Sequence, residues 1–162
     1  GVAARARALG AAIASHDDTT EAHVARSLEL GARVAEFPTT LEAARAYRRA
    51  GVPVMMGAPN ILRGGSHSGN VAAAELAAEG LLDILSSDYA PAALLMGAMT
   101  LADMIADLSA AVRTVTRAPA LAAGLPDRGE IAPGMRADLL RLAHVDGLTV
   151  VTGVWSAGRQ VG

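Results

Sequence analysis

The chain has 162 residues and a formal net charge of -2, with 52% hydrophobic and 19% charged residues. This balance is typical of a globular domain and excludes an electrostatic footprint for nucleic acid. Cysteine is absent and all 14 basic residues are arginine, so the chain supplies no disulfide, thiolate ligand or Schiff-base lysine. No apolar stretch reaches the roughly 18 residues of a membrane span, and the first residues are too charged for a secretory signal. We therefore expect a cytoplasmic protein that binds neither nucleic acid nor membrane.

Four glycines punctuate the first half of the chain, each at the end of a helix-like stretch and just before a short apolar run. A residue without a Cβ suits the left-handed position past a helix end. Short apolar runs without alternation indicate strands that are buried on both faces. The glycines are Gly10, Gly31, Gly51 and Gly80, and the predicted strands are residues 11–15, 32–37, 52–57 and 81–87.

Helical signals fill the stretches between these strands. Residues 18–21 and 39–42 match the capping box, in which a short polar residue and a later Glu satisfy free backbone N–H groups. Further helices are expected from Val71 and within residues 91–115, with a plausible start at Thr100. The order βαβαβαβα predicts an α/β fold with a parallel sheet. A doubly wound sheet and half of a (β/α)8 TIM-type barrel share this pattern, and the pattern does not separate them.

The composition changes at about residue 126. Residues 129–139 are turn-rich, and residues 139–142 and 148–155 are predicted strands, followed by a turn and a last short strand. We therefore predict two domains: half of a hydrolase barrel over residues 1–125, and part of a small appended β domain over residues 126–162.

Polar residues follow all four predicted strands, at the end where parallel α/β folds bind their ligands. His16 ends the first strand and could bind a divalent metal, although a hydrogen-bonded histidine in a turn is an equally good interpretation. Asp88 follows the fourth strand and could bind a metal and accept a proton from water. Its alternative role is to cap the next helix.

A glycine-rich loop follows the third strand and has the composition of an anion site. Its glycines allow close backbone approach, Arg63 offers a forked charge, and a helix from Val71 would point its N–H groups at the same place. The alternative is a solvated loop that only caps the helix through Asn70. His67 could bind phosphate, bind metal or transfer a proton. The candidate substrate-binding residues are Arg63, Ser66, His67, Ser68 and Asn70.

The motifs at the four strand ends together resemble the phosphonate-metabolism family of α-D-ribose 1-methylphosphonate 5-triphosphate diphosphatases, within the amidohydrolase superfamily. They occur in the family's order: Ser15-His16-Asp17-Asp18, Glu36-Phe37-Pro38-Thr39, residues 57–70, and Ser86-Ser87-Asp88-Tyr89. The resemblance implies that the strands are the last four of an eight-stranded barrel, with His16 as a metal ligand and Asp88 as metal ligand and base. It also implies a divalent metal cofactor, zinc or manganese.

The chain departs from the superfamily pattern in two ways. Glu36 stands where a histidine is common, and the His-x-His pair of the first barrel strand is absent. We therefore expect this chain to be the C-terminal portion of an enzyme and to be inactive alone.

The implied reaction is the hydrolysis of a phosphoanhydride of ribose 1-methylphosphonate 5-triphosphate, which releases diphosphate. One alternative is another amidohydrolase reaction, such as deamination or cyclic-amide hydrolysis. The other is a non-catalytic half-barrel, whose strand edges would bind a second copy or the missing half.

Overall fold

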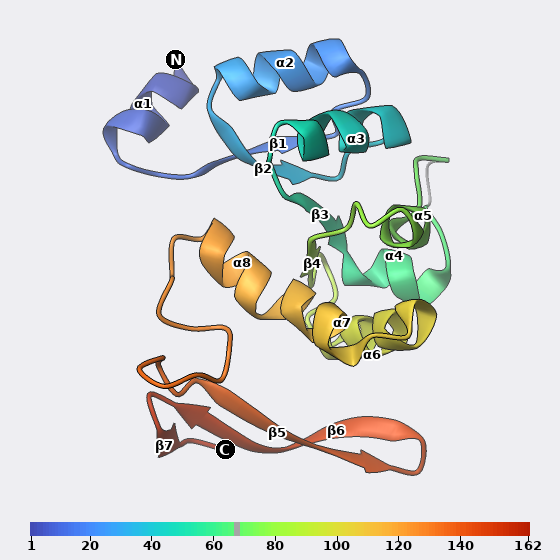
Figure 1. Ribbon diagram of the computed structural model, residues 1–162, viewed down its shortest axis with the longest axis vertical. Helices are drawn as coiled ribbons and strands as arrows, with labels where there is room; N and C mark the ends of the chain where they lie inside the picture. The colour runs from blue at the N-terminus through green and yellow to red at the C-terminus, as the bar shows by residue number, and fades with distance from the viewer. Residues whose placement is uncertain (67–68) are drawn as a thin grey trace.

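The computed structural model describes residues 1–66 and 69–162, in which helices and strands alternate before a terminal β hairpin (Figure 1). The strands are β1 (Ile13–His16), β2 (Ala32–Glu36), β3 (Val54–Gly57), β4 (Ile84–Ser86), β5 (Leu139–Val145), β6 (Leu148–Ser156) and β7 (Arg159–Gln160). The helices are α1 (Val2–Ala8), α2 (Glu21–Glu29), α3 (Leu41–Arg49), α4 (Ala58–Arg63), α5 (Ala73–Ala78), α6 (Ala93–Ile105), α7 (Leu108–Val115) and α8 (Arg117–Ala122).

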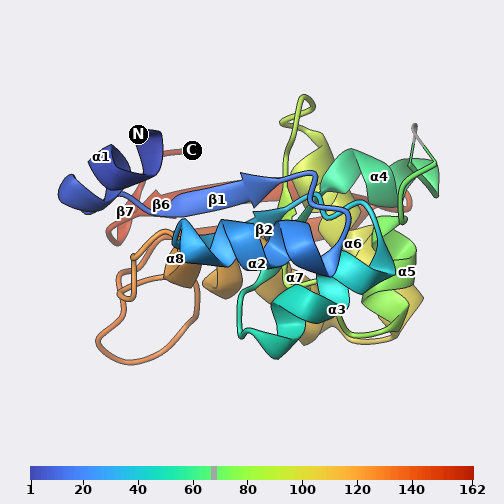
Figure 2. The ribbon, with the colours of Figure 1, turned by 90° about the horizontal axis from the view of Figure 1, so that it is seen from above.

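The first four strands form a parallel sheet in the order β1-β2-β3-β4. Crossover connections are right-handed, so strands added in one direction place every crossover helix on the same face. Figure 2 shows α2 and α3 together on one side of β1 and β2. A doubly wound sheet would instead reverse its strand order and carry helices on both faces. The sheet therefore has the architecture of part of a (β/α)8 barrel, which confirms the predicted fold class.

The hydrophobic core lies between this sheet and its helices. Strand residues such as Val54 and Leu85 pack there against Tyr47 of α3, Leu76 of α5 and Leu101 of α6, all at most 2% exposed. On the opposite face, Val34 of β2 and Ile84 of β4 are also buried, at 8% and 2% exposure. On that face the side chains at the ends of β1 and β2, His16 and Glu36, are exposed and half-buried.

The glycine signals are confirmed, and the predicted capping boxes are wrong in position. All four punctuating glycines have positive φ and follow a helix. The helices α2 and α3 are capped by Thr20 and Thr40, whose hydroxyls accept hydrogen bonds from the backbone N–H groups of His23 (3.3 Å) and Ala43 (3.1 Å). The side chain of Asp18, the first residue of one predicted box, is engaged elsewhere.

The helices after β3 and β4 also differ from the prediction. An unpredicted short helix, α4, follows β3, and α5 begins at Ala73, two residues beyond the expected start. The helical stretch after β4 begins at Ala93, before Thr100, and is divided in two. Ala106, with φ 54°, ends α6, and Asp107 caps α7 by accepting a hydrogen bond from the N–H of Ala110 at 2.9 Å.

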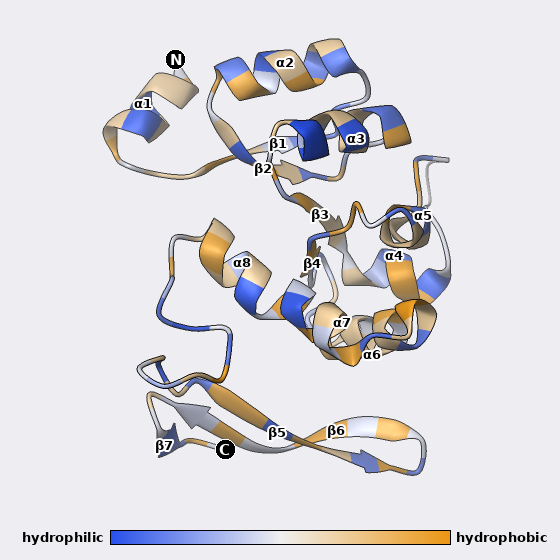
Figure 3. Ribbon diagram, in the orientation of Figure 1, coloured by the Kyte–Doolittle hydropathy of each residue, from blue (hydrophilic) through white to orange (hydrophobic). Residues whose placement is uncertain are grey.

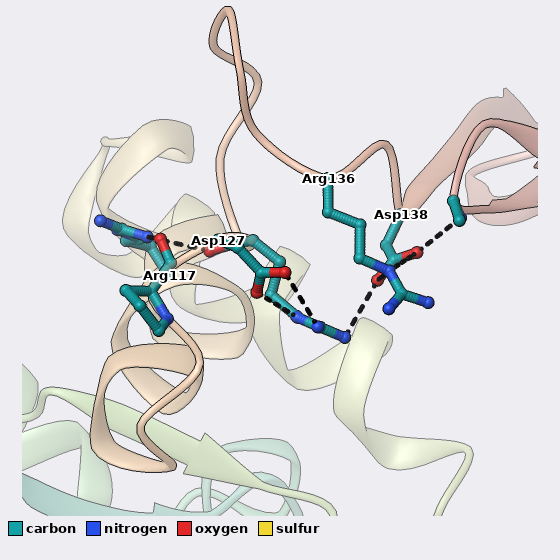
Figure 4. Close-up of polar contacts among 7 residues, drawn as sticks. Arg117, Asp127, Arg136 and Asp138 are labelled. Atoms are coloured by element: carbon teal, nitrogen blue, oxygen red, sulfur yellow. Dashed lines mark hydrogen bonds and ion pairs between the residues drawn. The ribbon is translucent and has the colours of Figure 1, made fainter.

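The last three strands form a separate antiparallel sheet in the order β5-β6-β7. Alternating charges hold the segment that leads into it (Figure 4). Arg128 pairs with Asp127 at 2.9 Å and with Asp138 at 3.3 Å, and Arg136 pairs with Asp138 at 2.8 Å. The pKa of Asp138 lies below its ordinary value because the backbone N–H of Ala157 donates to it and because Arg136 hydrogen-bonds to it. The second sheet falls within the predicted second domain, whose boundary at residue 126 stays a prediction.

Much of the hairpin between β5 and β6 is apolar, as its colouring in Figure 3 shows, and much of that apolar surface is exposed. Side chains of 37% to 63% relative exposure are Leu140, Leu142, Val145, Leu148, Val150 and Val151. These six residues lie on two paired strands of the second sheet. None of the helices in the described ranges has the length and apolar character to cross a membrane.

Candidate active site

The four parallel strands end side by side, and their last residues define what we call the carboxyl edge: His16, Glu36, Gly57 and Ser86. The register pairs His16 with Glu36, and Gly57 with Ser86. Paired residues in a parallel sheet point to the same face, so the side chains of His16 and Glu36 are neighbours on the face opposite Val54 and Leu85. The edge where the sequence predicts a ligand site therefore carries the predicted polar groups.

Two neighbouring residues, Asp17 and Phe37, contact the imidazole of His16. Its Nδ1 lies 2.9 Å from Oδ2 of Asp17, and its ring centroid lies 5.4 Å from that of Phe37. An Nδ1–H that donates to Asp17 leaves Nε2 of a neutral imidazole as the acceptor. The side chain is 58% exposed, so this nitrogen can reach a ligand in front of the sheet.

Three residues at the carboxyl edge are left-handed without being glycine. Asp17, Phe37 and Asp88 have φ values of 59°, 52° and 51°, and each follows the end of a strand by one or two residues. This conformation costs a residue with a Cβ about 1 kcal/mol or more, and such strain persists only where the surroundings impose it. At this edge the left-handed conformation turns the chain sharply after β1, β2 and β4.

A buried polar network imposes the turn after β1. The hydroxyl of Tyr47 donates to Asp18 and lies 2.8 Å from Oγ of Ser15, and Ser27 donates to Asp18 at 2.7 Å. Tyr47 is fully buried. Burial raises the pKa of its hydroxyl, and the hydrogen bond to Asp18 raises it further. The loop that follows His16 is therefore hydrogen-bonded to α3 through Asp18 and Tyr47.

The loops after β1 and β2 are also tied directly to each other. The Thr40 hydroxyl donates to the carbonyl of Thr19 at 2.6 Å, the hydroxyls of Thr39 and Thr19 lie 2.8 Å apart, and the N–H of Thr39 donates to the carbonyl of Asp18 at 2.9 Å. The polar motifs of β1 and β2 therefore form one connected unit.

Asp88 lies against the end of β3. A Cβ placed on Gly57 would be 2.9 Å from Oδ2 of Asp88, so the carboxylate occupies the space that any larger residue at position 57 would fill. The alternative role of Asp88 as a helix cap is wrong, because α6 begins at Ala93 and has no side-chain cap. Nearby, Oγ of Ser86 is buried without a hydrogen-bond partner among the described residues.

The N–H groups of two residues at the start of α5 have acceptors within the chain. Asn60 accepts from Ala73 at 2.9 Å, and Glu75 accepts from Ala72 at 3.0 Å. The prediction that this helix start faces an anion stays a prediction. Arg63 ends α4, and its Cζ lies 5.2 Å from the ring centroid of Tyr89.

The remaining predicted loop residues are placed only in part. Ser66 is half-buried and Asn70 is exposed, while His67 and Ser68 lie outside the described residues. The substrate-binding role of these four residues and of Arg63 stays a prediction.

The metal prediction can be compared with the donors that the chain brings together. His16 ends one outer strand of the sheet and Asp88 follows the other. Within residues 1–66 and 69–162, no group of three or more His, Asp or Glu side chains could hold a metal ion. Metal binding by this chain, with His16 and Asp88 as ligands, therefore stays a prediction.

Several contacts of the site carry no recognisable sequence signal. The alanines on the same face of α3 indicate that Tyr47 is buried, but no local pattern indicates its contact with Asp18. The contacts of Asn60 with α5 and of Tyr89 with Arg63 join different loops, so only the folded chain reveals them.

The fold and the carboxyl edge define the class of protein to which this chain belongs. The sequence model of the amidohydrolase family matches residues 2–161, and the chain is a member of that family. It is 56% identical over 163 residues to the α-D-ribose 1-methylphosphonate 5-triphosphate diphosphatase of Escherichia coli (strain K12). This similarity confirms the resemblance identified from the strand-end motifs. The match covers 99% of this chain and 43% of that protein, so the chain spans less than half of its relative.

Solved structures support the same fold. An amidohydrolase from Thermotoga maritima MSB8 matches with a TM-score of 0.74 and 24% identity over 94% of this chain and 44% of that one. A prolidase in complex with N-methylphosphonate-L-proline matches with a TM-score of 0.70 and 20% identity, over 99% and 47% of the two chains. Molinate hydrolase matches with a TM-score of 0.65 and 13% identity, over 99% and 44%. At these identities the likeness shows the fold alone.

Proposed function

We propose that this chain is the C-terminal portion of a metal-dependent hydrolase that acts on ribose 1-methylphosphonate 5-triphosphate and releases diphosphate. The observation that carries the proposal is the 56% identity to the E. coli diphosphatase, which extends over 99% of the chain. The active protein then comprises this chain together with the additional length found in that relative. We call this the full-length protein.

In the proposed reaction, the oxygen of a water molecule attacks the phosphorus nearest the ribose. The anhydride bond between that phosphorus and the next one breaks, and diphosphate leaves with the bond's electron pair. Asp88 accepts the proton of the water, since it lies at the carboxyl edge with its carboxylate packed on Gly57. Arg63 and the loop residues Ser66, His67, Ser68 and Asn70 bind the phosphates.

A divalent metal, when bound, would supply charge neutralisation for the phosphates and a more acidic water. His16 would offer Nε2 to it, with Asp17 fixing the ring through Nδ1. Asp88 would be the second ligand from this chain. The other ligands come, in this proposal, from the part of the full-length protein that lies outside this chain. Zinc and manganese both suit such donors.

The decisive experiment measures diphosphate release from ribose 1-methylphosphonate 5-triphosphate by the full-length protein with zinc or manganese. Asp88→Asn keeps the shape of the side chain but removes the base, so kcat is expected to fall by about 100-fold or more. Asp103→Asn is the matched control, because Asp103 lies exposed on α6, away from the carboxyl edge. Diphosphate release by the Asp88→Asn variant at the wild-type rate would refute the assigned role.

Assays with different substrates separate the rival functions. Turnover of a nucleobase-like amide or amine, with none of the triphosphate, would favour a deaminase or cyclic amidase. The 162-residue chain alone is expected to be inactive, because in this proposal the other metal ligands lie outside it. Metal-dependent hydrolysis by that chain would show that the additional length is not needed.

A further inference from the structure

The aromatic ring of Tyr89 lies against the guanidinium of Arg63, a residue of the proposed phosphate loop. Tyr89 follows Asp88 directly in the segment after β4, while Arg63 ends α4 after β3. The Cζ of Arg63 lies 5.2 Å from the centroid of the Tyr89 ring, within the range of a cation–π interaction. Two loops of the carboxyl edge therefore meet through this pair, and the residue beside the proposed base contacts the proposed phosphate ligand.

Tyr89 contributes little to the packing of the fold at this position. Its side chain is 61% exposed, and its hydroxyl makes no hydrogen bond in the parts of the chain that the structure describes. The other tyrosine, Tyr47, is fully buried and hydrogen-bonded. The exposed ring of Tyr89 therefore has the guanidinium of Arg63 as its neighbour.

That contact matters for phosphate binding because of the geometry of arginine. A guanidinium binds phosphate through a planar fork of N–H groups, and a long side chain loses rotamer freedom when it adopts that one orientation. A ring that lies against the guanidinium restricts the side chain before the phosphate binds. Part of the rotamer freedom of Arg63 is then already lost in the free protein, so less is lost when phosphate binds.

We propose that Tyr89 is a positioning residue, which holds the Arg63 guanidinium in the orientation that binds the triphosphate of the substrate. This inference rests on the proposed function for the identity of the substrate, and it adds a residue and a role that the strand-end motifs alone do not assign. Because the ring face makes the contact, phenylalanine at position 89 should serve as well as tyrosine. Because the ring acts through Arg63, its effect should vanish when Arg63 is absent.

The test compares Tyr89→Leu and Tyr89→Phe in the full-length protein, each with Arg63 intact and with Arg63→Met. With Arg63 present, Tyr89→Leu is expected to raise KM about two- to five-fold, the range for an exposed cation–π pair, with kcat unchanged. Tyr89→Phe should match the wild type, and Tyr89→Leu should have no further effect in the Arg63→Met background. Arg141→Met removes the guanidinium of another cation–π pair, 5.6 Å from the Trp155 ring in the second sheet, and should leave KM unchanged.

A KM for Tyr89→Leu equal to that of the wild type would overturn the proposal, as would an equal increase in the Arg63→Met background. A second measurement separates this from the proposed function: calorimetric binding of inorganic triphosphate to the same variants. If the wild type binds triphosphate but releases no diphosphate, the proposed function fails, and the Kd values test Tyr89 by the same pattern. A wild-type protein that does not bind triphosphate would overturn the positioning role as well.

Discussion

The substitution Gly57→Ala tests the close approach between the end of β3 and Asp88. The backbone of Gly57, with φ −78° and ψ 135°, is open to any residue, so no conformational reason requires glycine there. An added Cβ would lie 2.9 Å from Oδ2, 3.1 Å from Cβ and 3.4 Å from Cγ of Asp88. Carbon atoms pack at about 3.5 Å or more, so the Asp88 side chain would have to move by roughly half an ångström.

The expected effect on activity is larger than the effect on stability. A displacement of about 1 Å at a reacting group can cost about 100-fold in rate, so we expect Gly57→Ala to lower kcat of the full-length protein by roughly 10- to 100-fold. Overpacking costs about 1–3 kcal/mol, and replacing glycine returns about 0.4–1 kcal/mol through the unfolded chain. Urea denaturation should therefore show a loss of roughly 1 kcal/mol, and diphosphate release measures the rate.

A double-mutant cycle with Asp88→Gly provides the control. That substitution removes all three atoms that the new Cβ would meet, so the stability cost of Gly57→Ala should disappear in its background. An equal cost in both backgrounds would refute the reasoning, because the loss would then arise from contacts other than Asp88. Wild-type kcat for the single variant Gly57→Ala would refute the placement of Asp88 as the base.

Two further predictions concern the packing and the polar network. Gly97→Ala places a Cβ 2.8 Å from Cβ of Ala58 where α6 crosses α4, so overpacking should outweigh the helix propensity of alanine and lower the free energy of unfolding by about 1–2 kcal/mol. Stability in urea equal to the wild type would contradict this. Tyr47→Phe leaves Ser15 and Asp18 short of a partner and should cost about 1–3 kcal/mol at neutral pH. The raised pKa of Tyr47 also means that wild-type stability is intact below the unfolded tyrosine pKa of about 10 and falls as the pH rises further. The chain has no lysine or cysteine to titrate there, so Tyr47→Phe should show a smaller decline, and an unchanged pH profile would count against the assignment.

The candidate site divides into residues that local patterns reveal and residues that they do not. His16 and Asp88 stand at predicted strand ends, and parallel strands end at one edge, so their shared location followed from the order of elements. The start of the helix behind the glycine loop was expected to offer its N–H groups to an anion, and Asn60 and Glu75 accept two of these groups. A competitor for a hydrogen bond can lie 13 residues away, as Asn60 does from Ala73, and no local motif reports it.

The sequence by itself determined the parallel α/β pattern and the places where helices end. Apolar runs without alternation require burial on both faces, and glycine alone takes the left-handed position past Gly10, Gly31, Gly51 and Gly80 without strain. Only the tertiary structure decided between a barrel and a doubly wound sheet, because that choice depends on which neighbour each strand joins. It also decided that Asp18 faces Tyr47 and that Tyr89 faces Arg63. Such contacts form between elements whose relative position is set by the packing of the whole sheet and its helices, and a linear pattern carries no record of that packing.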